Sequence, residues 1–89
     1  ENAYALEVSG TSMEPAFGPG DILIVAPSAT IRRGDRVVIK TKDGAVMAKE
    51  LVRQTATKVE LKSINPEHDS PVLNLDDIDW IARILWVSQ

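Results

Sequence analysis

The dipeptide Asp43-Gly44 constrains the fold of this chain most, because it separates two runs of strand-forming residues. Aspartate followed by glycine tolerates the positive φ angles of a tight hairpin turn. The run before it, 36–40, is rich in valine and isoleucine, and the run after it, 46–54, has a length typical of a strand. The sequence therefore predicts two antiparallel strands joined by a turn at 42–44.

Further short strand-like runs lie on both sides of this hairpin. Turn segments rich in glycine, proline, asparagine or aspartate separate the runs, and helical periodicity is nearly absent. A second turn is expected at 55–57, and 64–71 reads as a loop. We therefore expect an all-β domain, a small coiled sheet or partly open barrel of about seven short strands. The additional expected strands are 4–8, 22–25, 58–62 and 80–88.

Length and composition restrict the classes of protein that fit. The 89 residues are enough for one domain, and 44% hydrophobic residues can supply its core. Cysteine is absent, which excludes disulfides and thiolate metal sites and is compatible with the reducing cytoplasm. The net charge of -3, with scattered basic residues, argues against direct DNA binding. The longest apolar run, 22–26, is far shorter than the roughly 18 residues of a membrane helix, and no signal peptide opens the chain.

Ser12 and Lys49 are a candidate nucleophile and its base. A serine hydroxyl needs a base, and the only histidine, His68, lies in a polar segment. On a strand over 46–54, Met47 and Leu51 would flank Lys49 on one face, and apolar neighbours favour the neutral amine that can accept a proton.

The backbone next to Ser12 suggests a second catalytic element. Gly10 would let the chain turn, and 13–17 could form a single helical turn. The backbone N–H groups of Ser12 and Met13 would then be candidates for an oxyanion hole. The alternative is that Ser12 only caps this turn.

Several motifs, in their order and spacing, resemble the C-terminal domain of LexA-like and phage-repressor-like S24 peptidases. The resemblance covers nearly the whole chain. It implies the LexA-type C-terminal fold and a Ser-Lys dyad for self-cleavage, with Ser12 as nucleophile and Lys49 as base. The motifs are Ser12-Met13-Glu14-Pro15, Gly20-Asp21, Gly34-Asp35, the strand bearing Lys49, Ile64-Asn65-Pro66 and the closing strand 80–88.

The same resemblance implies a biological role. In such a repressor, self-cleavage inactivates the protein, and RecA filaments formed after DNA damage stimulate the cut, as in the SOS response or prophage induction. Residues 1–89 would be the peptidase-like domain. A helix-turn-helix DNA-binding domain and the cleavage site would lie outside this chain. We expect a cytoplasmic protein without cofactor, metal or membrane partner.

Other functions fit parts of the sequence. A non-catalytic dimerisation module of a repressor, with a vestigial dyad, has the same motifs. An SH3-like binding barrel is disfavoured by the aromatic content of 4%. For a metal, His68 lacks a second histidine or cysteine. The acidic residues Asp76, Asp77 and Asp79 lack the frame of a calcium loop, so an exposed acidic turn is expected.

The C-terminal segment is a candidate dimer interface. Two tryptophans, two isoleucines, a leucine and a valine crowd into 80–87. An exposed apolar edge strand needs a cover, and pairing with the same strand of a second copy would supply it. The alternative is a central strand that is packed on both faces within one protomer. The expected interface residues are Ile81, Arg83, Ile84, Leu85, Trp86 and Val87.

Overall fold

The computed structural model describes residues 2–10, 13, 17–27, 29–64 and 71–88, and its strands form one antiparallel sheet. The strand order is β1-β2-β7-β3-β4-β5-β6, with β1 and β6 at the two edges. The prediction of an all-β domain of about seven strands is confirmed, and the sheet is open. The strands are β1 (Tyr4–Glu7), β2 (Ile22–Ala26), β3 (Arg36–Thr41), β4 (Val46–Gln54), β5 (Lys58–Ser63), β6 (Val72–Asn74) and β7 (Ile78–Ser88).

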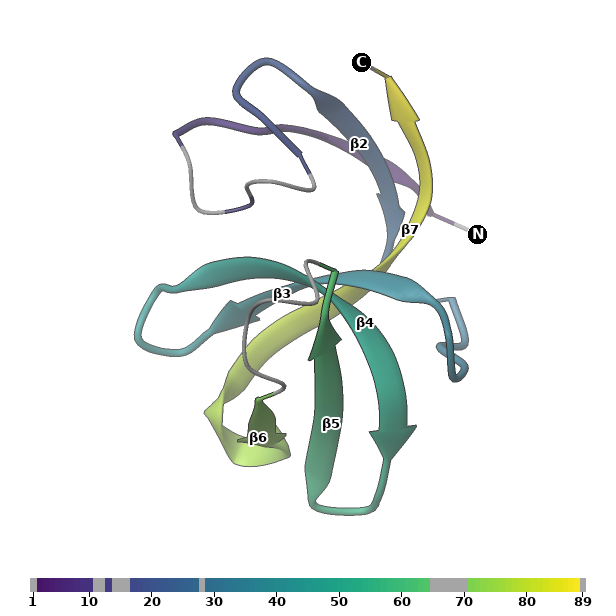
Figure 1. The fold of residues 1–89 in the computed structure, drawn as a ribbon, viewed down its shortest axis with the longest axis vertical. Coiled ribbons are helices and arrows are strands. Elements are labelled where there is room, and N and C mark those ends of the chain that lie inside the picture. Colours follow the sequence, from purple (N-terminus) through teal and green to yellow (C-terminus); the bar gives the residue numbers. More distant parts are fainter. Residues whose placement is uncertain (1, 11–12, 14–16, 28, 65–70, 89) are drawn as a thin grey trace.

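The long strand β7 lies between β2 and β3 in the sheet. Its first half pairs with β3, from Thr41↔Ile78 to Val37↔Arg83, and its second half pairs with β2 from Arg83 to Ser88. Figure 1 shows β7 running past β3 and on to β2. The prediction of an edge strand is therefore wrong for β7 as a whole. This central position explains the apolar residues of β7 that pack into the core, whereas Leu85 and Trp86 are exposed.

Two hydrophobic clusters form the core. The N-terminal cluster joins β1, β2 and β7 to one face of β3. The hairpin cluster is formed by side chains of β3, β4 and β5 on the other face of β3. Adjacent side chains of β3 point to opposite faces, so Val37 and Ile39 enter the hairpin cluster while Val38 enters the N-terminal cluster. The buried members are Val8, Met13, Phe17, Leu23, Val25, Val38 and Ala82 in the N-terminal cluster, and Val37, Ile39, Leu51, Val59 and Leu61 in the hairpin cluster.

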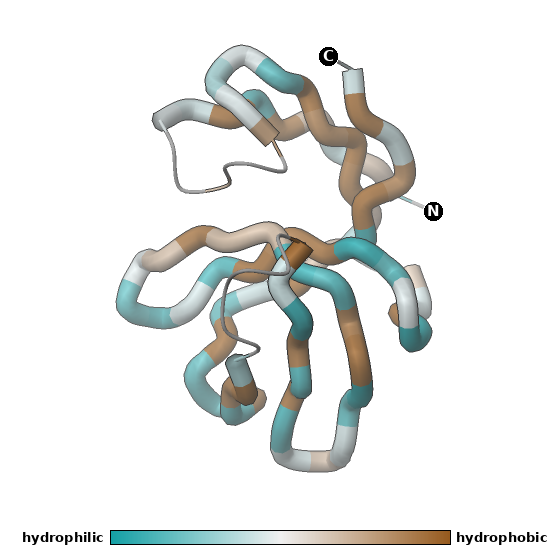
Figure 2. Tube along the Cα trace, viewed as in Figure 1, coloured by the Kyte–Doolittle hydropathy of each residue, from teal (hydrophilic) through white to brown (hydrophobic). Residues whose placement is uncertain are grey.

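The predicted hairpin at 42–44 is confirmed. Gly44 has a φ of 94°, which glycine adopts without steric cost. The Thr41 N–H donates to the Ala45 carbonyl at 2.9 Å, and the Thr41 hydroxyl donates to the Asp43 carboxylate. This turn is hydrophilic, in contrast to the apolar stretches along the adjoining strands (Figure 2).

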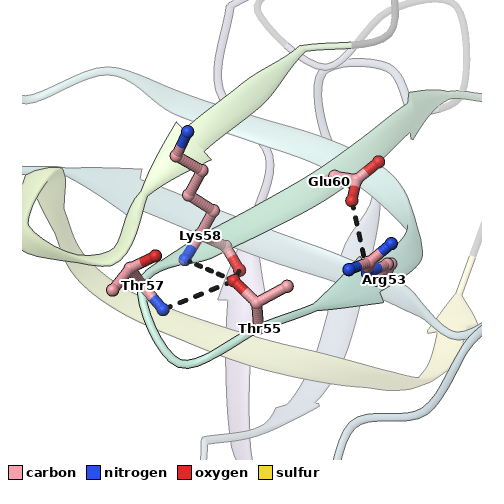
Figure 3. Close-up of polar contacts among 5 residues, drawn as sticks. All are labelled: Arg53, Thr55, Thr57, Lys58 and Glu60. Carbon is pink, nitrogen blue, oxygen red and sulfur yellow. Dashed lines mark hydrogen bonds and ion pairs between the residues drawn. The ribbon is translucent and has the colours of Figure 1, made fainter.

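The predicted turn at 55–57 is also confirmed, and Thr55 holds it together. The Thr55 hydroxyl oxygen accepts the backbone N–H of Lys58 at 3.1 Å and that of Thr57 at 3.4 Å (Figure 3). The Thr55 N–H donates to the Lys58 carbonyl at 2.9 Å. Two residue pairs further along the hairpin, Arg53 and Glu60 form an exposed ion pair at 3.6 Å.

The segment before β7 differs from its prediction. The sequence analysis did not predict the short strand β6 or the 3-10 turn Leu75–Asp77, and β7 begins at Ile78, before the predicted 80. Asp76 and Asp77 are exposed on the 3-10 turn, whereas Asp79 is exposed on β7, outside the expected acidic turn. No group of metal-binding side chains gathers within the described ranges. In the same ranges, no helix has the length and apolar character to cross a membrane.

Candidate functional site

Lys49 lies in the middle of β4 and is half-buried. Leu51 is buried in the hairpin cluster, and Met47 packs against that cluster. The alternation along a strand places Lys49 on the same face as these two residues, as the sequence predicts. The stem of Lys49 thus has an apolar neighbour on either side along its own strand.

The neighbouring strands complete the surroundings of Lys49. Its register partners are Val37 on β3 and Ser63 on β5. Val37 is fully buried, and Ser63 is 7% exposed. Directly opposite residues of an antiparallel pair share a face, with Cβ atoms about 4.5–5.5 Å apart. Lys49 therefore lies between an apolar side chain and a buried hydroxyl.

The other face of β4 carries a different pattern. Glu50 follows Lys49 and is the register partner of Arg36 on β3 and of Lys62 on β5. Opposite charges that face each other across strands stabilise a sheet modestly. Glu50 thus lies between two basic residues in the strand register, on the face opposite Lys49, as expected from the alternation.

Described residues before and after Ser12 make backbone hydrogen bonds. The N–H of Val8, which is buried, donates to the Asp21 carbonyl at 2.8 Å. Gly10 has a φ of 72°, as expected for the predicted turn. The Phe17 N–H donates to the Met13 carbonyl at 3.0 Å.

Ser12 itself lies outside the described residues, as does His68. The nucleophile, its distance from Lys49 and the oxyanion hole at Ser12 and Met13 therefore stay predictions. Met13 is buried in the N-terminal cluster, against which Ala48 and Ile64 also pack. The residue after Ser12 and the residue before Lys49 thus belong to one cluster.

The predicted dimer residues divide into those that contact other parts of the domain and those that are exposed without such a contact. Ile84 and Val87 pack against the N-terminal cluster, Ile81 packs against the hairpin cluster, and Arg83 pairs with Asp35. The remaining two are exposed, Leu85 by 45% and Trp86 by 61%. A shift in the β2–β7 register leaves Leu85 without a partner on β2, since Val25 pairs with Ile84 and Ile24 pairs with Trp86.

Sequence reasoning missed Ser63 as a neighbour of Lys49. The predicted strand ended at 62, one residue too early, whereas β5 extends to Ser63. Counting residue pairs outwards from the turn at 55–57 would have placed Ile64 opposite Lys49. The register shift between Leu51 and Arg53 places Ser63 there, so no signal in the sequence could have found it.

Two known proteins that are similar to this chain are both named as repressors. Repressor protein C of Rhizobium phage 16-3 is 44% identical over 73 residues, which are 73% of this chain and 28% of that protein. Prophage repressor CohE of Escherichia coli (strain K12) is 32% identical over 77 residues, 85% of this chain and 34% of that protein. The chain thus spans about a third or less of the length of these relatives. Residues 1–85 match the profile of the family described as Peptidase S24-like, and the chain belongs to that family.

Proposed function

We propose that this chain is the Ser-Lys peptidase domain of a phage-type transcriptional repressor that cuts its own polypeptide. The observation that supports this most is the placement of Lys49. Its amine is carried on a strand whose same face presents Met47 and Leu51, beside buried Val37. A lysine amine held beside a serine hydroxyl is a group that can take the serine proton as general base. Both relatives described above bear the name repressor.

The proposed reaction uses Ser12 and Lys49 as one unit. The Ser12 hydroxyl attacks the scissile carbonyl carbon, and its proton passes to the Lys49 amine. The backbone N–H groups of Ser12 and Met13 hold the negative oxygen of the tetrahedral intermediate. Lys49 then donates the proton to the leaving amine, and water releases the acyl group from Ser12 with Lys49 again as base.

The proposed biological role is the inactivation of a DNA-bound repressor. A separate N-terminal domain would read DNA, since the net charge of this chain is -3. Cleavage between the two domains would release that DNA-reading domain. By family resemblance, RecA filaments would stimulate the cut in the cytoplasm.

We also propose that the chain is a homodimer that pairs through β7. Exposed Leu85 and Trp86, next to each other on β7, support this part of the proposal. They equally support the second candidate function, a dimerisation module whose dyad does not act. Self-cleavage distinguishes these two functions, because only a working dyad gives fragments.

The test is self-cleavage of the full-length repressor at alkaline pH, followed on a gel. We expect cleavage by the wild type and none by Ser12→Ala or Lys49→Ala, since nucleophile and base act together. Lys62→Ala is the matched control, because Lys62 is an exposed lysine on the neighbouring strand β5. This variant should cleave normally. Normal cleavage by either dyad variant would falsify the assignment, and a wild type that never cuts would favour the dimerisation module.

A further inference from the structure

We propose that a cleft beside the β3–β4 turn binds an arginine side chain of a partner polypeptide. The cleft has a volume of about 600 Å³, within the roughly 300–1,000 Å³ of typical ligand clefts. This site would act independently of the proposed function, because it contains neither Ser12 nor Lys49. The lining residues are Thr41, Lys42, Asp43, Ala45, Met47, Leu73 and Asp77.

Two parts of the chain that are distant in sequence form the cleft. The β3–β4 turn and the start of β4 supply one side, and β6 with the 3-10 turn supplies the other. The Lys42 N–H donates to the Asp77 carbonyl at 2.9 Å and so joins the two turns. A backbone hydrogen bond therefore holds the two sides of the cleft together.

The apolar part of the lining suits a hydrocarbon chain. Met47 and Leu73 are half-buried and pack against the hairpin cluster, and Ala45 is exposed beside them in the lining. Long basic side chains lay their methylene groups along apolar surface while the charged group stays in a polar setting. The stem of an arginine can thus lie against these residues with its head among the charged residues of the cleft.

The charged residues of the lining select a cation. Asp43 and Asp77 contribute two carboxylates and Lys42 contributes one amine, so one further positive charge would neutralise the cleft. The Thr41 hydroxyl and the Ala45 N–H both donate to Oδ1 of Asp43. Among the described residues, neither Asp43 Oδ2 nor the Asp77 carboxylate accepts a hydrogen bond or joins an ion pair. These oxygens can therefore accept hydrogen bonds from a ligand.

An arginine of a partner polypeptide fits this cleft better than other cations. Its planar guanidinium has five N–H donors and can bond to two carboxylates at once, whereas a lysine amine is a compact, strongly hydrated charge. Lys42, Asp43 and Asp77 are all exposed, so the cleft is open to solvent. Sites for free small molecules bury most of their ligand. An open cleft is better suited to a side chain that a partner presents from its own surface.

The test is a methyl NMR titration of the full-length repressor with the blocked tripeptide Ala-Arg-Ala. We expect saturable shifts of the methyl signals of Ala45, Met47 and Leu73, which line the cleft. Asp77→Asn keeps the backbone carbonyl that binds Lys42 and should weaken binding about threefold to tenfold, the effect of one lost hydrogen bond. Lys42→Gln should strengthen binding about threefold, because it removes a like charge.

The matched control is Asp76→Asn. Asp76 is exposed on the same 3-10 turn but does not line the cleft, so this variant should bind as the wild type does. For the peptide, Ala-Lys-Ala should bind more weakly than Ala-Arg-Ala, and the uncharged Ala-Gln-Ala should give no saturable shift.

Four outcomes would overturn the arginine site. The first two are an absence of shifts at millimolar Ala-Arg-Ala and equal shifts with Ala-Gln-Ala. The third is an Asp77→Asn variant that binds like the wild type. The fourth is an equal loss of binding in Asp76→Asn and Asp77→Asn, since a general attraction to the acidic turn would then explain the binding. None of these outcomes bears on self-cleavage, which is tested separately with Ser12→Ala and Lys49→Ala.

Discussion

The Asp35 carboxylate lies 3.6 Å from the Arg83 guanidinium and so joins the turn before β3 to the middle of β7. The same oxygen accepts the Arg32 N–H at 2.8 Å, which closes the turn. Arg83 is the residue at which β7 changes partner, since it pairs with Ala26 on β2 and with Val37 on β3. Asp35 thus binds the residue of β7 at which the strand pairing changes from β3 to β2.

Two substitutions of Asp35 distinguish the contribution of the turn hydrogen bond to stability from that of the ion pair. Asp35→Ala removes both interactions and should lower the free energy of unfolding by about 1–2 kcal/mol. Asp35→Asn keeps an acceptor for the Arg32 N–H and should cost about 0.5 kcal/mol, because ion pairs with exposed partners contribute little. Urea denaturation at low and high salt measures both. An Asn variant as unstable as the Ala variant would show that the charge dominates.

The β4–β5 hairpin should depend on the hydroxyl of Thr55. This oxygen accepts two backbone N–H groups of the turn, so Thr55→Ala should lower the free energy of unfolding by about 1 kcal/mol. Thr57→Ala is the matched control, since Thr57 contributes its backbone N–H to the turn, and it should have a smaller effect. Thermal denaturation compares the two variants. Equal losses would mean that strand propensity, not the hydroxyl, sets the stability of this hairpin.

Asp43 should make the stability of the domain depend on acid pH. The hydrogen bond from the Thr41 hydroxyl, and then that from the Ala45 N–H, hold the pKa of Asp43 below its usual range. A carboxyl whose folded pKa is lowered stabilises the fold above its unfolded pKa, about 4, and loses that contribution as the pH falls through the folded value. Asp43→Asn should therefore lower Tm near neutral pH and flatten its decline below about pH 4.

Melting curves from pH 7 to pH 2.5 check this prediction. Asp76→Asn removes the same charge from the exposed 3-10 turn and controls for net charge. A wild type and an Asp43→Asn variant that lose the same Tm between pH 4 and pH 2.5 would contradict the prediction.

The sequence predicts the local features of this fold well. The turn at Asp43-Gly44 depends on adjacent residues, and the face of Lys49 depends only on the alternation of its own strand. Both features depend only on a few consecutive residues. The short strand β6 was not predicted, because three residues are too few to show a period of two.

Features that depend on distant residues were not predicted. The register shift between Leu51 and Arg53 decides that Ser63, and not Ile64, faces Lys49, yet a bulge has no clear signal in this stretch. The apolar residues of β7 fit a central strand and an interface strand equally well. Only the pairing of β7 with both β2 and β3 decides between them.

The homodimer prediction can now be narrowed to the second half of β7. Pairing with β3 ends at Arg83, and from there to Ser88 β7 pairs with β2 on one side. Among the described strands, none pairs with its other side over this stretch. The same strand of a second copy could pair there about a two-fold axis and cover the exposed side chains of Leu85 and Trp86.

Sedimentation at micromolar concentration tests this interface with two matched variants. We expect a wild-type dimer and a folded Trp86→Lys monomer, because a lysine at the interface would carry a desolvated charge. Val72→Lys places the same charge on β6, an edge strand of the sheet, where Val72 is 55% exposed, and this variant should remain dimeric. Ile84→Lys is a poor test of the interface, because Ile84 packs against the N-terminal cluster and its loss should unfold the domain. A wild type that stays monomeric, or a Trp86→Lys variant that remains a dimer, would show that β7 does not form the interface.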